Sequence, residues 1–256
     1  MNFFLSLFLL IFIWVNSFAQ NRTYEGSFLS INVSYLELKD EFNHGLVFRG
    51  PDIGLEYGIQ RLDGKKYFEY VAVLGAGGKT TAGTWGFRWL LSPLNVHYSW
   101  KIKDGENFNL FIGPSARVNY NIQNYPELHT GPIIWMGNYD VGVQLSSFIS
   151  IKKKLVELKL NTNAIGWQSR PEQERNPYYY SAGFGENFSD LHKNLELGGV
   201  DKFNQTTFEA RLFLDKKNKA RSISYLFFYT GYYDRPEFTE VFHAIKYTWF
   251  LNAPKS

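Results

Sequence analysis

Cysteine is absent from this chain of 256 residues. A fold of this size without disulfides depends on backbone pairing and side-chain packing. Net charge is also small, +3 at pH 7, and the charged residues are spread along the chain. A nucleic-acid-binding protein concentrates basic residues on one surface, so the sequence predicts no nucleic-acid partner.

Long hydrophobic runs are missing too, apart from one at the N-terminus. That run covers residues 3–15, and Ser17 and Ala19 then place small residues at the two positions that a signal peptidase reads. We predict a cleavable signal peptide over residues 1–19, with an uncleaved anchor helix as the alternative because no basic residue precedes the run. A cysteine, which a lipoprotein would need, is lacking at the cleavage point. No later run approaches the about 18 residues of a membrane helix, which excludes a helical-bundle membrane protein.

Aromatic residues are abundant: they make up 18% of the chain, yet mean hydropathy is only −0.27. Strands of a membrane β-barrel alternate between apolar and polar positions, so their average hydropathy stays low even where one face is strongly apolar. The composition therefore favours a β-barrel over a helical membrane protein.

The last strand-like run, residues 239–251, alternates most clearly, as strand side chains do between two faces. The two faces carry Ile245, Tyr247, Trp249 and Leu251 on one side and Glu240, Ala244, Lys246 and Thr248 on the other. This pattern resembles the closing strand of Gram-negative outer-membrane β-barrel proteins, whose last membrane strand typically ends in an aromatic residue. The resemblance implies that the apolar face meets lipid and the charged face meets a closed lumen. A five-residue tail after Leu251 departs from a terminal aromatic residue.

Period-two patterns and turn residues together predict ten strands. They cover residues 23–38, 46–61, 66–76, 84–102, 108–123, 139–151, 154–167, 205–215, 219–232 and 238–251. Tight charged turns, two with an Asp-Gly hairpin signal, alternate with longer loops. Short periplasmic turns and long extracellular loops are typical of outer-membrane barrels. We therefore predict an all-β fold over residues 20–256, a closed antiparallel up-and-down transmembrane β-barrel of about ten strands, within a range of eight to twelve.

Two strands need separate comment. In the fourth, the outward apolar positions change from odd to even numbers near Ser92-Pro93, which predicts a β-bulge, where proline is tolerated. The ninth, residues 219–232, is apolar on both faces, so its orientation stays open.

The inward faces predict a charged lumen. Its residues are Asp52, Glu56, Glu69, Arg88, Lys101, Arg117, Asp140, Glu157, Lys159, Glu209, Arg211, Glu240 and Lys246. One interpretation is a polar conduit that selects a solute. The other, which we favour, is a plug of salt bridges, because acids and bases nearly balance and ten strands enclose little more space than the eight that side chains can fill.

Two catalytic possibilities arise from family resemblances. His97 and Ser99 resemble the His and Ser, two residues apart, of outer-membrane phospholipase A, with Asn95 or Asn109 as a neighbour, but the surrounding motif is absent and the strand phase places both residues in the lumen. The ten-strand count is also similar to that of the omptin proteases, whose acids and His gather at the extracellular rim. Candidates there are Asp140, Asp190, His192, Asp234 and Glu237. The paired-acid motifs of that family are not visible.

The longest loop, residues 168–204, combines charged and aromatic residues and has a possible short helix at 188–195. Loops of this length are usually functional or disordered. Its binding candidates, with one residue of the loop at 124–138, are Arg170, Arg175, Tyr178, Tyr179, Tyr180 and Trp135. They could form a ligand-binding lid, joined by His129 and Met136, or an aromatic collar that only packs on the barrel rim.

The sequence thus predicts a non-enzymatic protein of the cell outer membrane, similar in its Asn-, Tyr- and Lys-rich style to uncharacterised barrels of the Bacteroidota. It would be a narrow porin-like channel or a plugged barrel with ligand-binding loops. Alternatives are an outer-membrane lipid or peptide hydrolase and a soluble, lipocalin-like carrier. The expected partners are membrane lipid, the barrel assembly machinery that the fold implies, and a small solute or extracellular ligand. We expect no cofactor and no metal.

Overall fold

The computed structural model describes residues 24–43, 45–81, 83–105, 107–127, 133–151, 154–171, 192, 195–214, 221–234 and 237–251. The proposed signal peptide, the C-terminal tail beyond Leu251 and several loop candidates, namely His129, Arg175 and Tyr178 to Tyr180, lie outside these residues.

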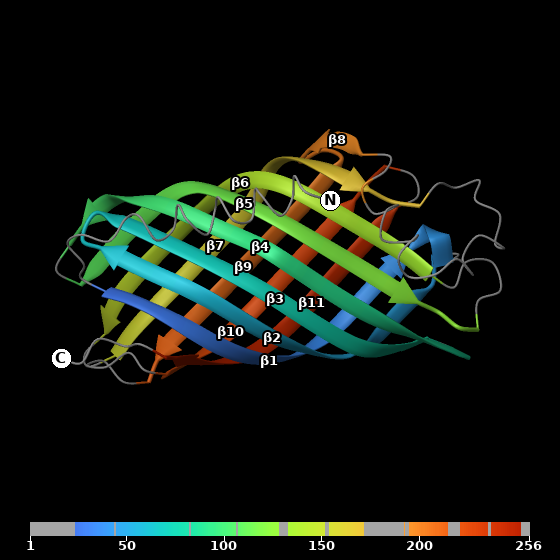
Figure 1. Cartoon of the computed structure of the whole chain (residues 1–256), viewed down its shortest axis with the longest axis horizontal. Helices are drawn as coiled ribbons and strands as arrows, with labels where there is room; N and C mark the ends of the chain where they lie inside the picture. Colours follow the sequence, from blue (N-terminus) through green and yellow to red (C-terminus); the bar gives the residue numbers. More distant parts are fainter. Residues whose placement is uncertain are drawn as a thin grey trace, which may run out of the picture.

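Strands dominate the described part of the chain. They are β1 (Tyr24–Asp40), β2 (Val47–Asp63), β3 (Lys66–Thr81), β4 (Thr84–Asp104), β5 (Phe108–Asn124), β6 (Ile133–Ile151), β7 (Lys154–Ser169), β8 (Glu196–Gly199), β9 (Phe203–Phe213), β10 (Arg221–Tyr232) and β11 (Phe238–Phe250), with a 3₁₀ turn η1 (Glu41–Asn43) after β1. All strands except the short β8 form a ring of antiparallel neighbours, which β1–β11 and β6–β7 pairing close (Figure 1). The protein is a closed ten-stranded antiparallel β-barrel, as the sequence predicted. Within the described residues, no helix has the length and hydropathy that a membrane span requires.

The barrel is strongly sheared. From Val33, successive hydrogen-bonded pairs lead through β2 to β5 and reach β6 at Trp135, whereas the opposite direction reaches β6 at Ser147, a stagger of twelve residues. Stagger and strand tilt are linked in a barrel, and the strands run obliquely to the long axis in Figure 1. Side chains far apart in sequence therefore meet at one level of the lumen.

The outer wall is apolar and exposed. Its large exposed side chains include Leu29, Val33, Ile53, Leu55, Leu74, Trp89, Leu91, Val143, Leu160, Ile245 and Trp249. A soluble protein rarely exposes so continuous an apolar surface, whereas a membrane barrel requires it. Among the described residues, the lumen side instead buries fifteen Asp, Glu, Lys and Arg side chains. This distribution is that of a transmembrane β-barrel, and it is the reverse of the apolar interior that a soluble carrier would have.

Both ends of the barrel can be recognised from its connections. The short β2–β3 and β4–β5 turns lie at one end, with Tyr24 and Phe250; we call it the short-turn end. The opposite end, where η1 and the long β7–β9 connection lie, is called the mouth. Strand β8, which the sequence did not predict, pairs there with Ile165–Gln168 of β7.

Two strands are longer than predicted. β3 continues to Thr81 and β6 begins at Ile133, although the sequence indicated loops from residue 77 and up to residue 138. Glycines suggested a turn in β3, but Gly77 lies within the sheet, where an added Cβ would come within 2.5 Å of the carbonyl oxygen of Pro51. Glycine is needed there for close backbone approach and does not end the strand.

The predicted bulge in β4 is confirmed from both sides. Pairing of β4 with β5 shifts by one residue between Leu91 and Leu94, and pairing of β4 with β3 shifts by one residue at the same level. The orientation of β10 is now defined as well, because its lumen side buries Ser222, Ser224, Leu226 and Thr230.

Candidate functional site in the barrel lumen

Aromatic side chains close the lumen at the short-turn end. The short-turn layer consists of Phe28, Tyr67, Phe111, Phe148, Phe213 and Phe250, all at most 6% exposed. Ring centroids lie 5.4 Å apart for Tyr67 and Phe148 and 5.8 Å apart for Phe213 and Phe250. Leu62 and Leu155 pack against both halves of the layer and join them. Gly58 makes room for Phe28, because an added Cβ would lie 2.3 Å from its ring.

A charge cluster lies directly above this layer. The lower cluster consists of Glu56, Glu69, Glu157, Lys159, Glu209, Arg211 and Lys246. Arg211 contacts Glu157 at 3.0 Å and Glu209 at 3.2 Å. Lys159 lies 2.6 Å from Glu69. The hydroxyl of Tyr67 donates to Glu157 at 2.8 Å and so links the cluster to the aromatic layer.

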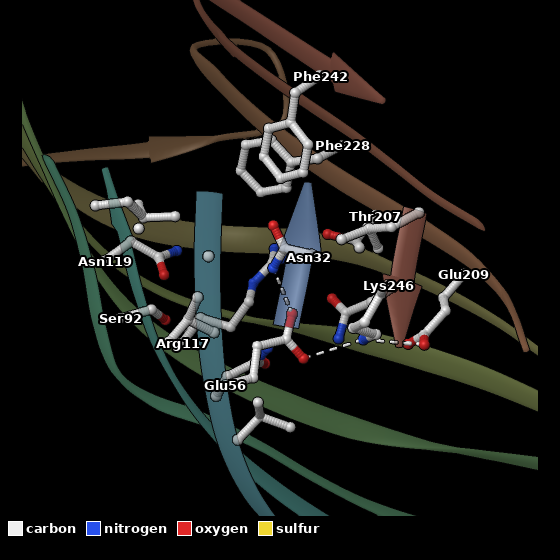
Figure 2. Close-up of a pocket in the computed structure, with 18 of the residues that line it drawn as sticks. Asn32, Glu56, Ser92, Arg117, Asn119, Thr207, Glu209, Phe228, Phe242 and Lys246 are labelled. Atoms are coloured by element: carbon white, nitrogen blue, oxygen red, sulfur yellow. Dashed lines mark hydrogen bonds and ion pairs between the residues drawn. The ribbon is translucent and has the colours of Figure 1, made fainter. Parts of the chain in front are cut away.

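Lys246 extends the lower cluster across the lumen. Its ammonium group lies 3.1 Å from Glu56 and 2.9 Å from Glu209, which come from β2 and β9 (Figure 2). Buried ions are costly unless opposite charges and hydrogen bonds compensate them. Each cation of the lower cluster contacts at least two carboxylates, so its three cations are compensated and its four carboxylates exceed them by one.

An upper cluster lies nearer the mouth. Arg88 pairs with Asp52 at 2.7 Å and with Glu240, to which the amide of Asn121 also donates. Beside it, Arg117 pairs with Asp140 at 2.9 Å and donates to the carbonyl oxygen of Gln205 at 3.0 Å. The upper cluster thus consists of Asp52, Arg88, Arg117, Asp140 and Glu240.

A cavity of about 130 Å³ separates the two clusters. One part of its lining consists of amides and a guanidinium group, with Asn32 from β1 and Arg117 and Asn119 from β5 (Figure 2). The other includes the stacked rings of Phe228 and Phe242, whose centroids lie 4.6 Å apart. A space of this size, with polar groups in its lining, has room for several water molecules, each of which needs roughly 10–15 Å³.

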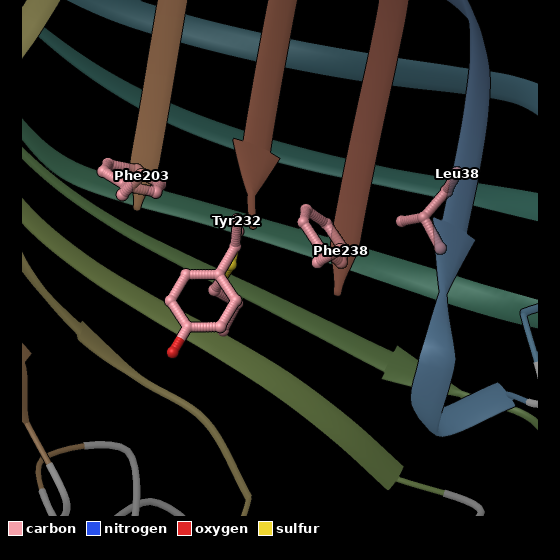
Figure 3. Packing of buried hydrophobic residues seen from close by; sticks show 5 residues of the cluster. Leu38, Phe203, Tyr232 and Phe238 are labelled. Carbon is pink, nitrogen blue, oxygen red and sulfur yellow. The ribbon is translucent and has the colours of Figure 1, made fainter. Parts of the chain in front are cut away.

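The mouth is closed by a second apolar layer. The mouth layer consists of Leu38, Met136, Phe203, Tyr232 and Phe238, with Phe48, Tyr125 and Ile134 beside it. Figure 3 shows Leu38, Phe203, Tyr232 and Phe238 projecting from neighbouring strands into the barrel. The described lumen is therefore filled from the short-turn layer to the mouth layer, except for the central cavity.

The thirteen lumen residues expected from the sequence are placed as follows. Twelve are at most 6% exposed and belong to the two clusters. Lys101 is the exception, since its ammonium group pairs at 3.3 Å with the exposed Asp104 at the short-turn end. Among the ionisable residues buried in the lumen, sequence analysis did not name Asp40, Tyr67 and Lys79. Extending the period-two pattern would have found Asp40 two residues beyond the expected end of β1, and Lys79 three residues beyond the expected end of β3.

His97 and Ser99 do not form a catalytic pair in the structure. Both are buried in the lumen, but Nδ1 of His97 is 3.0 Å from the amide of Asn161, and the Ser99 hydroxyl has no hydrogen-bond partner. Neither expected neighbour, Asn95 nor Asn109, contacts this histidine. A nucleophile needs its base within hydrogen-bond reach, and the two side chains lack that contact.

The rim candidates also have separate partners. Asp140 is inside the lumen with Arg117, whereas Asp234 pairs with Lys202 at 2.9 Å. His192 contacts Tyr139 and packs on Tyr120, and its burial lowers the pKa of the imidazole. Asp190 lies outside the described residues. The described candidates therefore do not assemble an omptin-like site.

Two of the proposed loop-binding residues are described, and both are buried. Trp135, expected in a loop, lies within β6 and is 2% exposed. Arg170 directly follows β7 and is 8% exposed, with its guanidinium group in the mouth.

Among the described residues, no group of three or more His, Asp or Glu side chains is arranged to hold a metal ion.

Fold and lumen together define a class, that of membrane-spanning antiparallel β-barrels with a filled interior. No protein-family model matches the chain, and no curated protein matches its sequence.

Solved structures similar to this chain are outer-membrane β-barrels of Gram-negative bacteria. The outer-membrane protease OmpT from Escherichia coli aligns over 90% of this chain and 97% of its own, with 6% identity and a TM-score of 0.48. The β domain of the Bordetella autotransporter BrkA aligns over 89% and 100%, with 11% identity and a TM-score of 0.44. The Pseudomonas putida toluene transporter TodX aligns over 91% and 92%, with 8% identity and a TM-score of 0.33.

Proposed function

We propose that this protein is a non-enzymatic outer-membrane β-barrel whose lumen is sealed and whose activity lies at its extracellular end. The observation that carries the proposal is the filled lumen, in which two apolar layers enclose two clusters of paired charges. A porin needs a continuous aqueous path, whereas in the described lumen two apolar layers and paired charges flank the central cavity.

The membrane location rests on the outer wall. Exposed apolar side chains cover it, and Trp100 and Trp249 lie near the short-turn end, where aromatic rings suit a membrane interface. We propose that the short-turn end is periplasmic, that residues 1–19 direct export and are cleaved, and that the barrel assembly machinery inserts the chain. A Bacteroidota-like origin remains part of this proposal and rests on composition.

The charge clusters are better explained by a lumen that is closed to ions than by an ion selectivity filter. A selectivity filter exposes charges to a water-filled path so that they can act on a passing solute. Here Arg88, Arg211 and Lys159 are each held by carboxylates and are at most 6% exposed. Their charge is already compensated, so little remains to attract an ion.

Conductance across a planar lipid bilayer tests the seal. We expect the purified full-length protein to give no steady single-channel current, because the short-turn layer and the lower cluster block the path. A variant with Phe28→Ala, Phe213→Ala and Phe250→Ala should conduct more, whereas Trp249→Ala on the outer wall should match the wild type. A large, stable conductance of the wild-type protein would contradict the proposal.

The central cavity favours a second candidate, a narrow channel that opens when the clusters rearrange. This candidate predicts that small solutes enter liposomes that contain the wild-type protein faster than they enter protein-free liposomes. A sealed barrel predicts equal rates of entry into both kinds of liposome.

Two other functions are disfavoured. The apolar outer wall argues against a soluble carrier, and the missing contact between His97 and Ser99 argues against a hydrolase.

A further inference from the structure

A guanidinium group is enclosed in the mouth of the barrel. The Nη2 atom of Arg170 donates to Oδ1 of Asp40 at 2.6 Å, and both side chains are at most 6% exposed. The guanidinium carbon lies 5.0 Å from the ring centroid of Phe42, 5.4 Å from that of Phe238 and 5.6 Å from that of Tyr232. Within the described part of the chain, one carboxylate and three rings surround this cation.

We propose that Asp40, Phe42, Tyr232 and Phe238 form a binding site for a guanidinium group, which Arg170 occupies in this structure and which an arginine side chain of an external peptide occupies in its place. Cation–π contacts and charge-assisted hydrogen bonds suit guanidinium better than ammonium, because the planar group stacks on rings and presents several N–H donors.

The carboxylate of Asp40 is not fully used by Arg170. Its Oδ1 atom accepts from Arg170 and from the backbone N–H of Phe42 at 3.0 Å, whereas its buried Oδ2 atom has no hydrogen-bond partner. An arginine that approaches without the constraint of the β7 backbone can donate to both oxygens. Such bidentate pairs are stronger and more specific than single contacts, so an external arginine can compete with the resident one.

The η1 turn and Tyr232, which carry part of the site, are held in position without an external ligand. The η1 turn is bound to the start of β11, because the backbone N–H of Glu41 donates to the carbonyl oxygen of Glu237 and the N–H of Glu237 donates to the Glu41 carboxylate, both at 2.9 Å. Tyr232 is held by a hydrogen bond from its hydroxyl to Glu196 at 2.9 Å. A preorganised site loses less entropy when it binds.

The described rim around the site is acidic. Carboxylates near it outnumber the cations Lys39 and Lys202, and they are Glu41, Glu196, Asp201, Asp234 and Glu237. A concentration of one sign of charge attracts ligands of the opposite sign and raises their association rate. The rim therefore favours the approach of a cationic peptide.

Chemical rescue tests the site in the full-length protein in detergent micelles. Arg170→Ala should lower the temperature at which the folded band is lost on a gel, and millimolar ethylguanidinium should restore at least half of the loss. The wild type, whose site is filled, should not respond. Arg170→Ala with Asp40→Asn should not respond either.

Ethylammonium is the matched control ligand, because it carries the same charge without the planar group. Equal rescue by both ligands, rescue that persists without Asp40, or no rescue at all would overturn the proposal. If Arg170→Ala gives no folded band, Arg170→Lys replaces it, since the lysine ammonium fills the cage poorly and the same ligand series applies.

Competition with the resident arginine is measured with a labelled Gly-Arg-Gly peptide. Its apparent affinity should be about tenfold higher for Arg170→Ala than for the wild type, because occupancy by Arg170 reduces the fraction of competent sites. A Gly-Lys-Gly peptide should show no such difference. Equal affinity of Gly-Arg-Gly for both proteins would show that Arg170 does not occupy a peptide site.

Discussion

Arg88 shows how a single residue stabilises the lumen. It bridges Asp52 and Glu240, which lie on β2 and β11, and its guanidinium group is 6.0 Å from the ring centroid of Phe242. Both carboxylates are at most 5% exposed. Loss of the arginine would remove the cation that pairs directly with both buried anions, whereas loss of all three charges together leaves no unpaired anion of this group.

We predict that Arg88→Ala lowers the free energy of unfolding by about 3–5 kcal/mol, the usual cost of breaking a buried ion pair. Urea unfolding in lipid vesicles measures this change. Arg88→Met combined with Asp52→Asn and Glu240→Gln should recover most of the loss.

The matched control is the exposed pair of Arg49 and Glu37, 2.7 Å apart and about half exposed. Arg49→Ala should cost no more than about 1 kcal/mol because solvent screens such pairs. Equal losses for Arg49→Ala and Arg88→Ala would contradict the assigned difference between the lumen and the outer surface.

At the scale of elements, the bulge in β4 determines what the lumen contains. One extra residue between Leu91 and Leu94 lets Arg88 and Ser92 point inward on one side of the bulge and His97 and Ser99 on the other. The hydroxyl of Tyr70 donates to the carbonyl oxygen of Pro93 at 2.9 Å and holds the bulge in place. A shift of one residue turns every side chain of a strand segment to the opposite face.

Deletion of Pro93 should therefore be tolerated, because it removes the extra residue and leaves Ser92 and His97 on the inner face of a regularly alternating strand. Deletion of Val118 from β5, which has no extra residue opposite the bulge, should prevent stable folding, because Asn119 and Asn121 would turn to lipid. The fraction of folded protein after refolding into detergent gives the comparison, and a Pro93 deletion that folds no better than the Val118 deletion would disprove the role of the bulge.

Strands and bulge were predictable because alternation is a local signal. The ten barrel strands and the slip in β4 follow from period two alone, but the orientation of β10 does not, because only Ser222, Ser224 and Thr230 distinguish its inner face from an outer face rich in aromatics. Glycines concealed the full length of β3. Strand β8 is too short to leave a pattern.

The ion pairs of the lumen were not predictable in the same way. Which residues face inward follows from each strand, but which acid meets which base depends on the stagger of the whole barrel. Arg88 and Glu240 are separated by 152 residues in sequence, and Arg170 and Asp40 by 130. No local sequence pattern spans such separations, so the structure was needed to find the guanidinium binding site.

At the scale of the whole molecule, closure of the barrel determines how strongly it resists unfolding in detergent. β1 pairs with β11 along thirteen residue pairs, from Phe28 with Phe250 to Asp40 with Phe238, so the first and last strands complete the ring. A closed barrel has no unpaired strand edge. Opening it requires the loss of many hydrogen bonds at once, and in lipid none of these would be replaced by water.

We therefore predict heat-modifiable migration on a detergent gel. Unboiled protein from the outer-membrane fraction should run as a compact band, and boiling should shift it to the position of the unfolded chain. Removal of β11, by ending the chain at Glu237, should abolish the compact band, because β1 and β10 would both become open edges. If the shortened chain still shifted on boiling, closure through β11 would not be the cause of detergent resistance. A full-length protein that was soluble and did not shift would contradict the membrane location.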